Sequence, residues 1–292
     1  MGAGTSRAFR FGVVATPHAG GKAWRESVRR IAGLGYGSVL MPDGVGLPSP
    51  FPALAMAAAV DARLRVGTFV AATPFRSAAT AAWEAQSLTA LTDGRFELGI
   101  GTGRPQTVAQ GAALLGGAEL TPAQRLGRVG ETLRALRERE EQHGGRQPAE
   151  PGQPGGRRTP VLIAAGGPRA LELAAREADT ITPAVAPDTP AAEVARLVAD
   201  VRGRAGERGA DIEFAVNTFV VGDDVPPEMA RRTGVDPARL AERDALTVLP
   251  GDPRRAADEI RRRRAEVGIS YVLVPEMFAE ALAPAVAELA GT

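Results

Sequence analysis

The sequence contains no cysteine, only two histidines and a single lysine, Lys22. Without cysteine, the chain has no disulfide, no thiolate nucleophile and no cysteine-ligated metal site. His18 and His143 lie far apart in the sequence, so a histidine-based zinc site is not expected either. The net charge of +1 over 292 residues gives no reason to expect binding to nucleic acid or to an anionic membrane. We therefore predict no metal and no nucleic-acid partner.

Long apolar runs are also absent. No stretch approaches the roughly 20 apolar residues that a membrane-spanning helix needs. Residues 1–10 lack the apolar core of a signal peptide. We therefore expect a cytoplasmic protein that has no membrane segment.

What the sequence does contain is a regular alternation of strand and helix patterns. Expected strands lie at 9–15, 37–41, 64–71, 95–101, 161–165, 179–182, 212–221 and 269–274, and expected helices at 24–34, 54–60, 77–91, 122–141, 171–178, 191–208, 253–267 and 278–289. Eight strand–helix units in series predict a parallel sheet closed as a (β/α)8 barrel, whose ligand site lies at the carboxyl ends of the strands. With 44% hydrophobic residues, a chain of 292 residues can bury such a core.

One segment interrupts the alternation. Residues 142–159 are rich in glycine and proline and contain almost nothing that could be buried. We interpret them as a mobile surface loop inside a single domain spanning residues 1–292. Two other features are interpreted as structural: Trp83 as part of a helix core, and the run Arg261–Arg264 as the solvated face of an amphipathic helix.

The turn after the fifth strand is the first candidate binding site. The apolar run from Val161 stops at Gly166, Gly167 and Pro168, and a helical pattern follows. Glycines allow a ligand to approach the backbone, and proline suits the first turn of a helix. The free N–H groups and the positive end of the helix dipole favour an anionic phosphate here. An ordinary tight turn between strand and helix is the alternative.

Four sequence blocks, in this order and spacing, resemble the luciferase-like monooxygenase family: Leu64-Arg-Val-Gly-Thr68 with Phe75-Arg76, then Asp93-Gly-Arg-Phe-Glu-Leu-Gly-Ile-Gly-Thr-Gly103, then Arg125-Leu126 with Glu131, then Ala164-Ala-Gly-Gly-Pro-Arg-Ala-Leu171. The resemblance covers nearly the whole chain. The form Ala-Ala-Gly-Gly-Pro is most similar to the deazaflavin-dependent members, which use coenzyme F420. The resemblance also implies a homodimer.

Cofactor-binding residues follow from the resemblance. Gly166, Gly167 and Pro168 match the turn that holds the cofactor phosphate in the family. Phe69 and Val70 match a non-proline cis peptide that bulges under the central ring of the cofactor. Further positions that the resemblance places beside the cofactor are Asp43, Ala72, Thr102 and Gly103. A plain barrel strand is the alternative at Phe69 and Val70.

Two proton-handling groups of the family are missing. Family members commonly carry a histidine after the acidic residue at Asp43, but this chain has Gly44. Relatives that oxidise sugar phosphates carry a glutamate where this chain has Arg104, so sugar-phosphate oxidation is disfavoured. His18, just after the first strand, is the remaining candidate acid or base; a water-exposed loop histidine is its alternative. Arg104 is a candidate for binding a substrate carboxylate or phosphate, or is a surface arginine.

Three functions remain open at this stage. The first is an F420-dependent oxidoreductase that transfers a hydride to or from a small organic substrate, reducing a C=C or C=N bond. The second keeps the fold and replaces F420 by FMN, giving a monooxygenase that uses reduced FMN and oxygen. The third is a non-catalytic flavin-binding relative. The identity of the substrate does not follow from the residues.

Overall fold

Parallel strands and helices alternate along the chain, as the sequence predicts. The structure, a computed structural model, describes residues 7–144, 158–225 and 236–292. Within these residues the main sheet is built from β1 (Arg10–Val14), β2 (Ser38–Met41), β3 (Arg65–Thr68), β4 (Ala71–Ala72), β5 (Phe96–Gly101), β6 (Val161–Ala165), β7 (Thr180–Pro183), β8 (Glu213–Asn217) and β11 (Ile269–Pro275). The order is β3-β2-β1-β11-β8-β7-β6-β5-β4, and β3 also pairs with β5. β3 and β4 are two parts of one predicted strand, and both pair with β5. The parallel sheet therefore closes as a (β/α)8 barrel.

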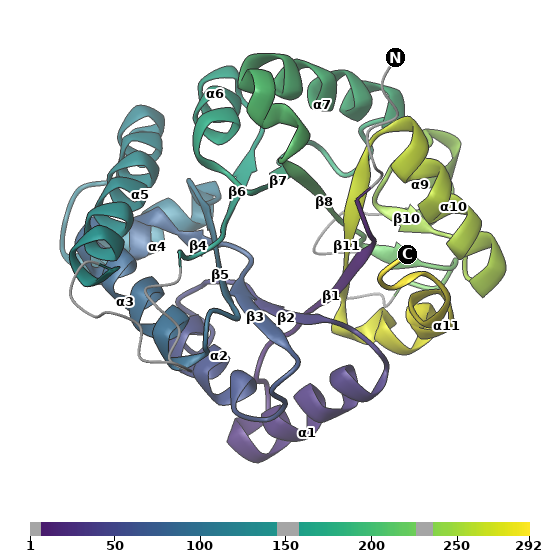
Figure 1. Ribbon diagram of the computed structural model, residues 1–292, viewed down its shortest axis with the longest axis horizontal. Helices are drawn as coiled ribbons and strands as arrows, with labels where there is room; N and C mark the ends of the chain where they lie inside the picture. The colour runs from purple at the N-terminus through teal and green to yellow at the C-terminus, as the bar shows by residue number, and fades with distance from the viewer. Residues whose placement is uncertain (1–6, 145–157, 226–235) are drawn as a thin grey trace. The chain divides into compact units, whose positions relative to one another are not determined.

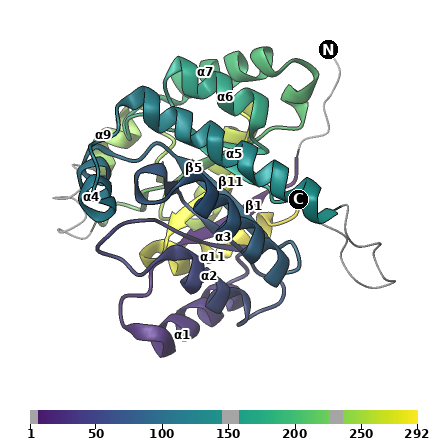
Figure 2. The same cartoon turned by 90° about the vertical axis from the view of Figure 1, so that its left-hand side faces the viewer.

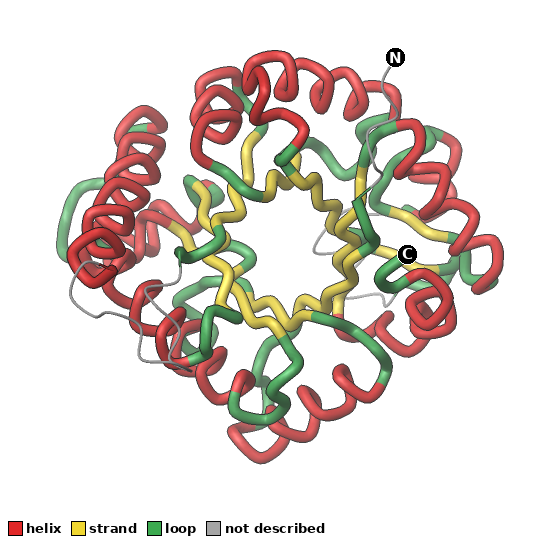
Figure 3. The backbone as a smooth tube through the Cα atoms, in the orientation of Figure 1, coloured by secondary structure: helices red, strands yellow, loops and turns green. Residues whose placement is uncertain are grey.

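The helices are α1 (Gly20–Gly33), α2 (Pro50–Ala58), α3 (Ala78–Leu91), α4 (Pro105–Leu115), α5 (Pro122–Gly144), α6 (Pro168–Glu177), α7 (Ala191–Ala205), α9 (Pro237–Glu242), α10 (Pro253–Glu266) and α11 (Ala279–Leu289). Figure 3 distinguishes the strands from the helices by colour. The strands are almost continuously apolar and buried, as expected for a parallel sheet covered by helices. The helices are amphipathic: α7 buries Val194, Val198 and Val201, which recur at helical spacing.

Contacts divide the chain into two compact units. The first comprises Met1–Val14, Arg30–Ser38 and Ala165–Thr292, and the second comprises Ala15–Arg29 and Val39–Ala164. In the first unit, β1 pairs with β11, β11 with β8, and β8 with β7, and α6 and α7 cover these last two strands (Figure 1). In the second unit, β5 pairs with β3, β4 and β6, and α3 packs along α5 (Figure 2).

The single domain over residues 1–292 stays a prediction. The predicted mobile loop at 142–159 lies largely outside the described residues, since α5 continues to Gly144 and the description resumes at Arg158.

Two predicted strands are interrupted. The third stops after Thr68 and resumes at Ala71, and the seventh is divided into β8 and β9 (Val220–Val221), which forms a separate small sheet with β10 (Val248–Leu249). The segment 104–121, where the sequence analysis predicts neither a strand nor a helix, contains α4. Pro105 at its first position and Gly116 in the left-handed conformation at its end are the start and stop signals of this helix.

Trp83 was wrongly assigned to the helix core, because its side chain is 59% exposed. Helix α3 turns Ala81, Ala82 and Ala85 towards the interior instead. These small side chains let the helix pack closely, and the bulky indole lies on the opposite side.

The interpretation of Arg261–Arg264 as a solvated face was also wrong at one position. Arg263 is only 3% exposed. Its guanidinium donates to the carbonyl oxygens of Leu246 (2.5 Å) and Val248, and its Nε donates to Glu259 (2.8 Å). A buried guanidinium needs such partners, because an unpaired buried charge is costly. Arg263 therefore fixes the segment before β10 to α10.

Candidate functional site

The bulge segment, residues 68–72, connects β3 to β4. The Phe69–Val70 peptide bond is cis, as the resemblance predicted. The hydroxyl of Thr68 donates to the carbonyl of Gly99 (2.6 Å), and the N–H of Phe69 donates to the carbonyl of Met41 (2.7 Å). A Cβ at position 99 would lie 1.9 Å from the carbonyl oxygen of Thr68, so only glycine permits this approach. The bulge is thus held by both neighbouring strands.

Asp43 fixes the other end of the bulge segment. Its carboxylate accepts a hydrogen bond from the N–H of Ala72 (3.1 Å) and is paired with the guanidinium of Arg76. Both side chains are shielded, with 4% exposure for Asp43 and 13% for Arg76. The structure therefore brings together Asp43 and Ala72, two of the predicted cofactor-binding residues.

Arg76 has further partners that the sequence did not indicate. Its Nε lies 3.0 Å from the carboxylate of Glu84 on α3, and its guanidinium stacks over the ring of Phe51, 5.0 Å from the centroid. Burial raises the pKa of Glu84, and the positive charge of Arg76 opposes this rise. Arg76 thus links the bulge segment to α2 and α3. It was part of a family-like block, but nothing in its position signalled a partnership with Asp43.

We predict that Asp43→Asn destabilises the fold and weakens cofactor binding. The new amide group would present N–H donors to Arg76, which has no acceptor for them, and would leave Glu84 as the carboxylate partner of this shielded guanidinium. Removing one partner of such a pair costs about 3 kcal/mol in free energy of unfolding. Because Ala72 is then less well held, we also expect cofactor affinity to fall about tenfold, which corresponds to the net value of roughly one hydrogen bond.

Urea unfolding and a cofactor titration of the purified variant measure these two effects. Asp258→Asn is the matched control, since Asp258 is 76% exposed in its pair with Arg261 and should change neither quantity. Unchanged unfolding and unchanged affinity in Asp43→Asn would refute the positioning role of Asp43.

Thr102 and Gly103 follow β5 and are half-buried. The guanidinium of Arg125 on α5 donates to both of their carbonyl oxygens, at 3.1 Å each. This contact fixes the backbone at the end of β5. Arg125 was noted in the sequence only as part of a family-like block, because its partners are backbone atoms that no residue pattern reveals.

Arg104 precedes α4 and is exposed, and no hydrogen bond or ion pair links its side chain to another described residue. An arginine in this state is available to bind an anion from solution. Its predicted role in binding a substrate carboxylate or phosphate stays a prediction.

His18 is exposed in the loop between β1 and α1. Its imidazole contacts the hydroxyl of Thr16 through Nε2, with Nδ1 at 3.4 Å. The contact orients the ring, and exposure leaves the ring accessible to solvent. Both the catalytic role and the alternative of a plain loop histidine remain compatible with this position.

The turn Gly166–Pro168 joins β6 to α6 in the first unit. A Cβ at position 166 would lie 2.2 Å from the carbonyl oxygen of Ala184, so this position requires glycine. Gly167 and Pro168 are exposed, and no side chain caps the helix. The first helical hydrogen bond runs from the N–H of Leu171 to the carbonyl of Gly167 (2.9 Å). The N–H groups of Arg169 and Ala170 precede that bond, so they point out of the helix end and suit an anion.

A second polar group, the Glu213 cluster, lies at the amino ends of strands in the first unit and comprises Arg10, Thr180, Glu213, Ser270 and Tyr271. Glu213 is 2% exposed, and its carboxylate accepts from Arg10 (2.5 Å), Thr180 (3.2 Å) and Ser270 (3.4 Å). Polar residues at the amino ends of barrel strands stabilise the fold, whereas ligands bind at the carboxyl ends. We therefore assign the Glu213 cluster to stability.

Within the described ranges, no helix is long and apolar enough to cross a membrane. The same part of the chain contains no group of three or more acidic or histidine side chains arranged to hold a metal ion.

The closed parallel barrel with helices between its strands defines an α/β-barrel protein. Proteins of this class bind their ligands at the carboxyl ends of the strands. A sequence profile described as luciferase-like monooxygenase matches residues 8–263. The chain therefore belongs to the luciferase-like monooxygenase family, as its sequence blocks predicted.

Solved structures share this fold at low sequence identity. The coenzyme F420-dependent tetrahydromethanopterin reductase from Methanopyrus kandleri aligns with a TM-score of 0.71 at 16% identity, over 97% of this chain and 99% of that one. An F420-dependent secondary alcohol dehydrogenase, in complex with an F420-acetone adduct, aligns with a TM-score of 0.71 at 16% identity, over 96% and 99% of the two chains. The long-chain alkane monooxygenase LadA aligns with a TM-score of 0.72 at 15% identity, over 97% and 92%.

Proposed function

We propose that this chain is an F420-dependent oxidoreductase that transfers a hydride between the reduced deazaflavin and a small organic substrate, reducing a C=C or C=N bond. The turn Gly166–Pro168 carries the proposal, because it combines a required glycine, an uncapped helix end and the Ala-Ala-Gly-Gly-Pro form that resembles deazaflavin-dependent enzymes. Family membership supports an oxidoreductase or monooxygenase, and two of the similar structures are F420-dependent enzymes.

The residues present fit such a cofactor. The N–H groups of Arg169 and Ala170 would hold a phosphate, helped by the positive end of the α6 dipole. The bulge segment and the backbone at Thr102 and Gly103 would lie against the ring system, with Asp43 holding Ala72 in place. The cofactor itself would supply a carbon-centred hydride donor or acceptor, and the protein would need to align it with the substrate.

Two side chains are proposed to act on the substrate. His18 would donate or accept the proton that accompanies the hydride, since its imidazole is exposed and is oriented by Thr16. Arg104 would bind a carboxylate or phosphate of the substrate, because its guanidinium makes no hydrogen bond or ion pair with another described residue and Arg104 directly follows Gly103. Gly44 in place of the usual histidine disfavours sugar-phosphate oxidation.

An FMN-dependent monooxygenase is the second candidate. It is favoured by the likeness of the fold to the alkane monooxygenase LadA, and to a riboflavin lyase whose structure contains modified FMN. The phosphate turn would serve FMN as well as F420. The homodimer and the cytoplasmic location stay predictions.

Titration of the cofactor-stripped protein with oxidised F420 and, separately, with FMN tests the proposal. We expect F420 to bind at least tenfold more tightly than FMN, and reduced F420 to be oxidised without oxygen when an unsaturated acceptor is added. A preference for FMN, with oxygen consumption when reduced FMN is supplied, would establish the monooxygenase instead. Binding of neither cofactor would refute both.

A further inference from the structure

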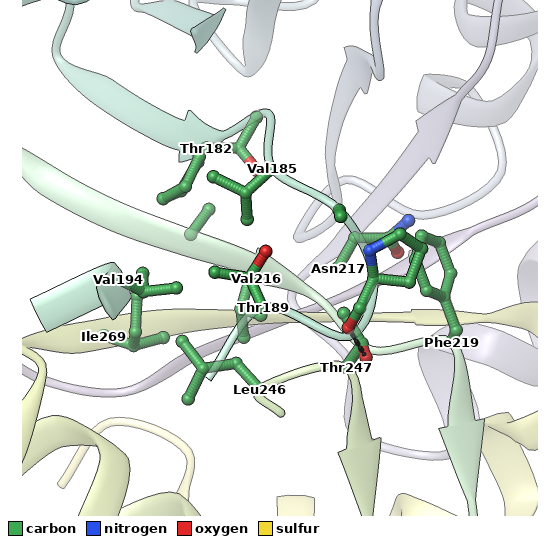
Figure 4. Close-up of a pocket in the computed structure, with 14 residues that line it drawn as sticks. Thr182, Val185, Thr189, Val194, Val216, Asn217, Phe219, Leu246, Thr247 and Ile269 are labelled. Carbon is green, nitrogen blue, oxygen red and sulfur yellow. Dashed lines mark hydrogen bonds between the residues drawn. The ribbon is translucent and has the colours of Figure 1, made fainter. Parts of the chain in front are cut away.

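A pocket in the first unit is unexplained by the proposed cofactor site (Figure 4). Its walls come from the carboxyl ends of β7 and β8, the loop 184–190, the start of α7 and the segment 246–247 that precedes β10. The cavity measures about 70 Å³, which is too small for a three-ring cofactor. Its occupant must therefore be a smaller molecule or one group of a larger one.

The lining of this pocket is neutral. Apolar side chains form most of it, including Val194, Val216 and Leu246, and none of the described residues that line it is charged. Placing a charged group against such walls without a partner is unfavourable. The pocket therefore selects against anions and cations.

Asn217 is one of the polar residues that line the pocket, together with Thr182, Thr189 and Thr247. Its side-chain oxygen is buried and has no hydrogen-bond partner among the described residues. Figure 4 shows the Asn217 amide beside Phe219, at the edge of the cavity. A buried oxygen of this kind is complementary to an N–H or O–H donor on a ligand. A lone water would satisfy the oxygen but would leave the apolar walls without contacts.

The walls are held in place before any ligand binds. The hydroxyl of Thr247 donates to the carbonyl of Pro187 (2.6 Å), which ties the loop 184–190 to the segment before β10. Arg263 donates to the carbonyl of Leu246 (2.5 Å) from the other side. A preformed cavity binds its ligand without the cost of ordering the walls.

We propose that this pocket binds a small neutral molecule, or a neutral group of a larger one, that joins an apolar body to a single hydrogen-bond donor directed at Asn217. The inference does not depend on the cofactor, so it stands or fails independently of the proposed function.

Ligand-observed NMR with three probes small enough for a cavity of about 70 Å³ tests this inference: ethanol, dimethyl ether and acetate. Ethanol has an apolar ethyl group and a donor, dimethyl ether is its isomer without a donor, and acetate is charged. We expect ethanol to bind about tenfold more tightly than dimethyl ether, and acetate not to bind. Equal binding of all three probes, or no binding of ethanol, would overturn the proposal.

Two variants locate the binding. Asn217→Leu should lower ethanol affinity about tenfold, to the level of dimethyl ether, while dimethyl ether binding is kept. Val185→Trp should abolish ethanol binding, because Val185 lines the pocket and is 38% exposed, so a larger side chain there covers the pocket without altering the core. Leu91→Trp, at a position 77% exposed on α3, is the control and should bind ethanol like the unmodified protein. Unchanged ethanol binding in Val185→Trp would show that the probe binds elsewhere.

Discussion

Gly166→Ala is expected to raise the dissociation constant of coenzyme F420 by about 100-fold or more. The added methyl group would lie 2.2 Å from the carbonyl oxygen of Ala184, so the backbone of the turn must move. The N–H groups of Arg169 and Ala170 move with it and lose their aim at the phosphate. Two hydrogen bonds to a charged group account for a loss of this size. Calorimetric titration of the cofactor-stripped variant measures the effect.

Two further glycine variants separate binding from folding. Gly203→Ala makes the same chemical change in α7, where nothing lies within 4 Å of the new methyl group, and should bind F420 normally. At Gly167 a methyl group also meets no protein atom, and the backbone conformation suits alanine, so Gly167→Ala should unfold at the normal temperature. If phosphate approaches this turn, Gly167→Ala still weakens F420 binding. Normal F420 affinity in both Gly166→Ala and Gly167→Ala would show that the phosphate does not bind at this turn.

The barrel was predictable because its signal is local. Each strand is a short apolar run bounded by turn residues, and each helix except α4 and the short α9 was predicted in roughly its observed place. The break in the third strand was not visible in this pattern. Residues 64–71 are as suitable for an extended strand as the others, and only the family resemblance indicated the cis bond at Phe69–Val70.

Residues that act through tertiary contacts were harder to find. Arg76 and Arg125 belong to family-like blocks, but their partners are distant in sequence. Asp43, the partner of Arg76, lies 33 positions away, and the partners of Arg125 are backbone carbonyl groups 22 and 23 positions away.

Trp83 was misplaced for a different reason. Helix α3 is rich in alanine on several sides, so its sequence does not define which face is buried. Glu213 begins an otherwise largely apolar strand, and a carboxylate buried in such a strand requires a cation or donors nearby, which Arg10 supplies here.

Glu213→Ala is expected to lower the free energy of unfolding by about 3–5 kcal/mol, because the substitution removes a carboxylate that is 2% exposed and is paired with the guanidinium of Arg10. The hydroxyls of Thr180 and Ser270 lose an acceptor at the same time. For a chain of this size, such a loss lowers the unfolding midpoint by about 10 °C. Thermal unfolding followed by circular dichroism measures it. Asp200→Ala, which breaks an exposed pair with Arg204, is the control and should leave the midpoint unchanged.

A double-mutant cycle decides whether the charge pair or the mere loss of packing is responsible. If Arg10 and Glu213 stabilise each other, Arg10→Ala combined with Glu213→Ala should cost less than the sum of the two single changes, since the interaction between them is lost only once. Arg10 also stacks on Tyr271, 4.1 Å from the ring centroid, so its replacement alone retains a separate cost. Strict additivity would show that the pair is not coupled. Because the cluster lies at the amino ends of the strands, F420 affinity should stay unchanged in every folded member of the cycle.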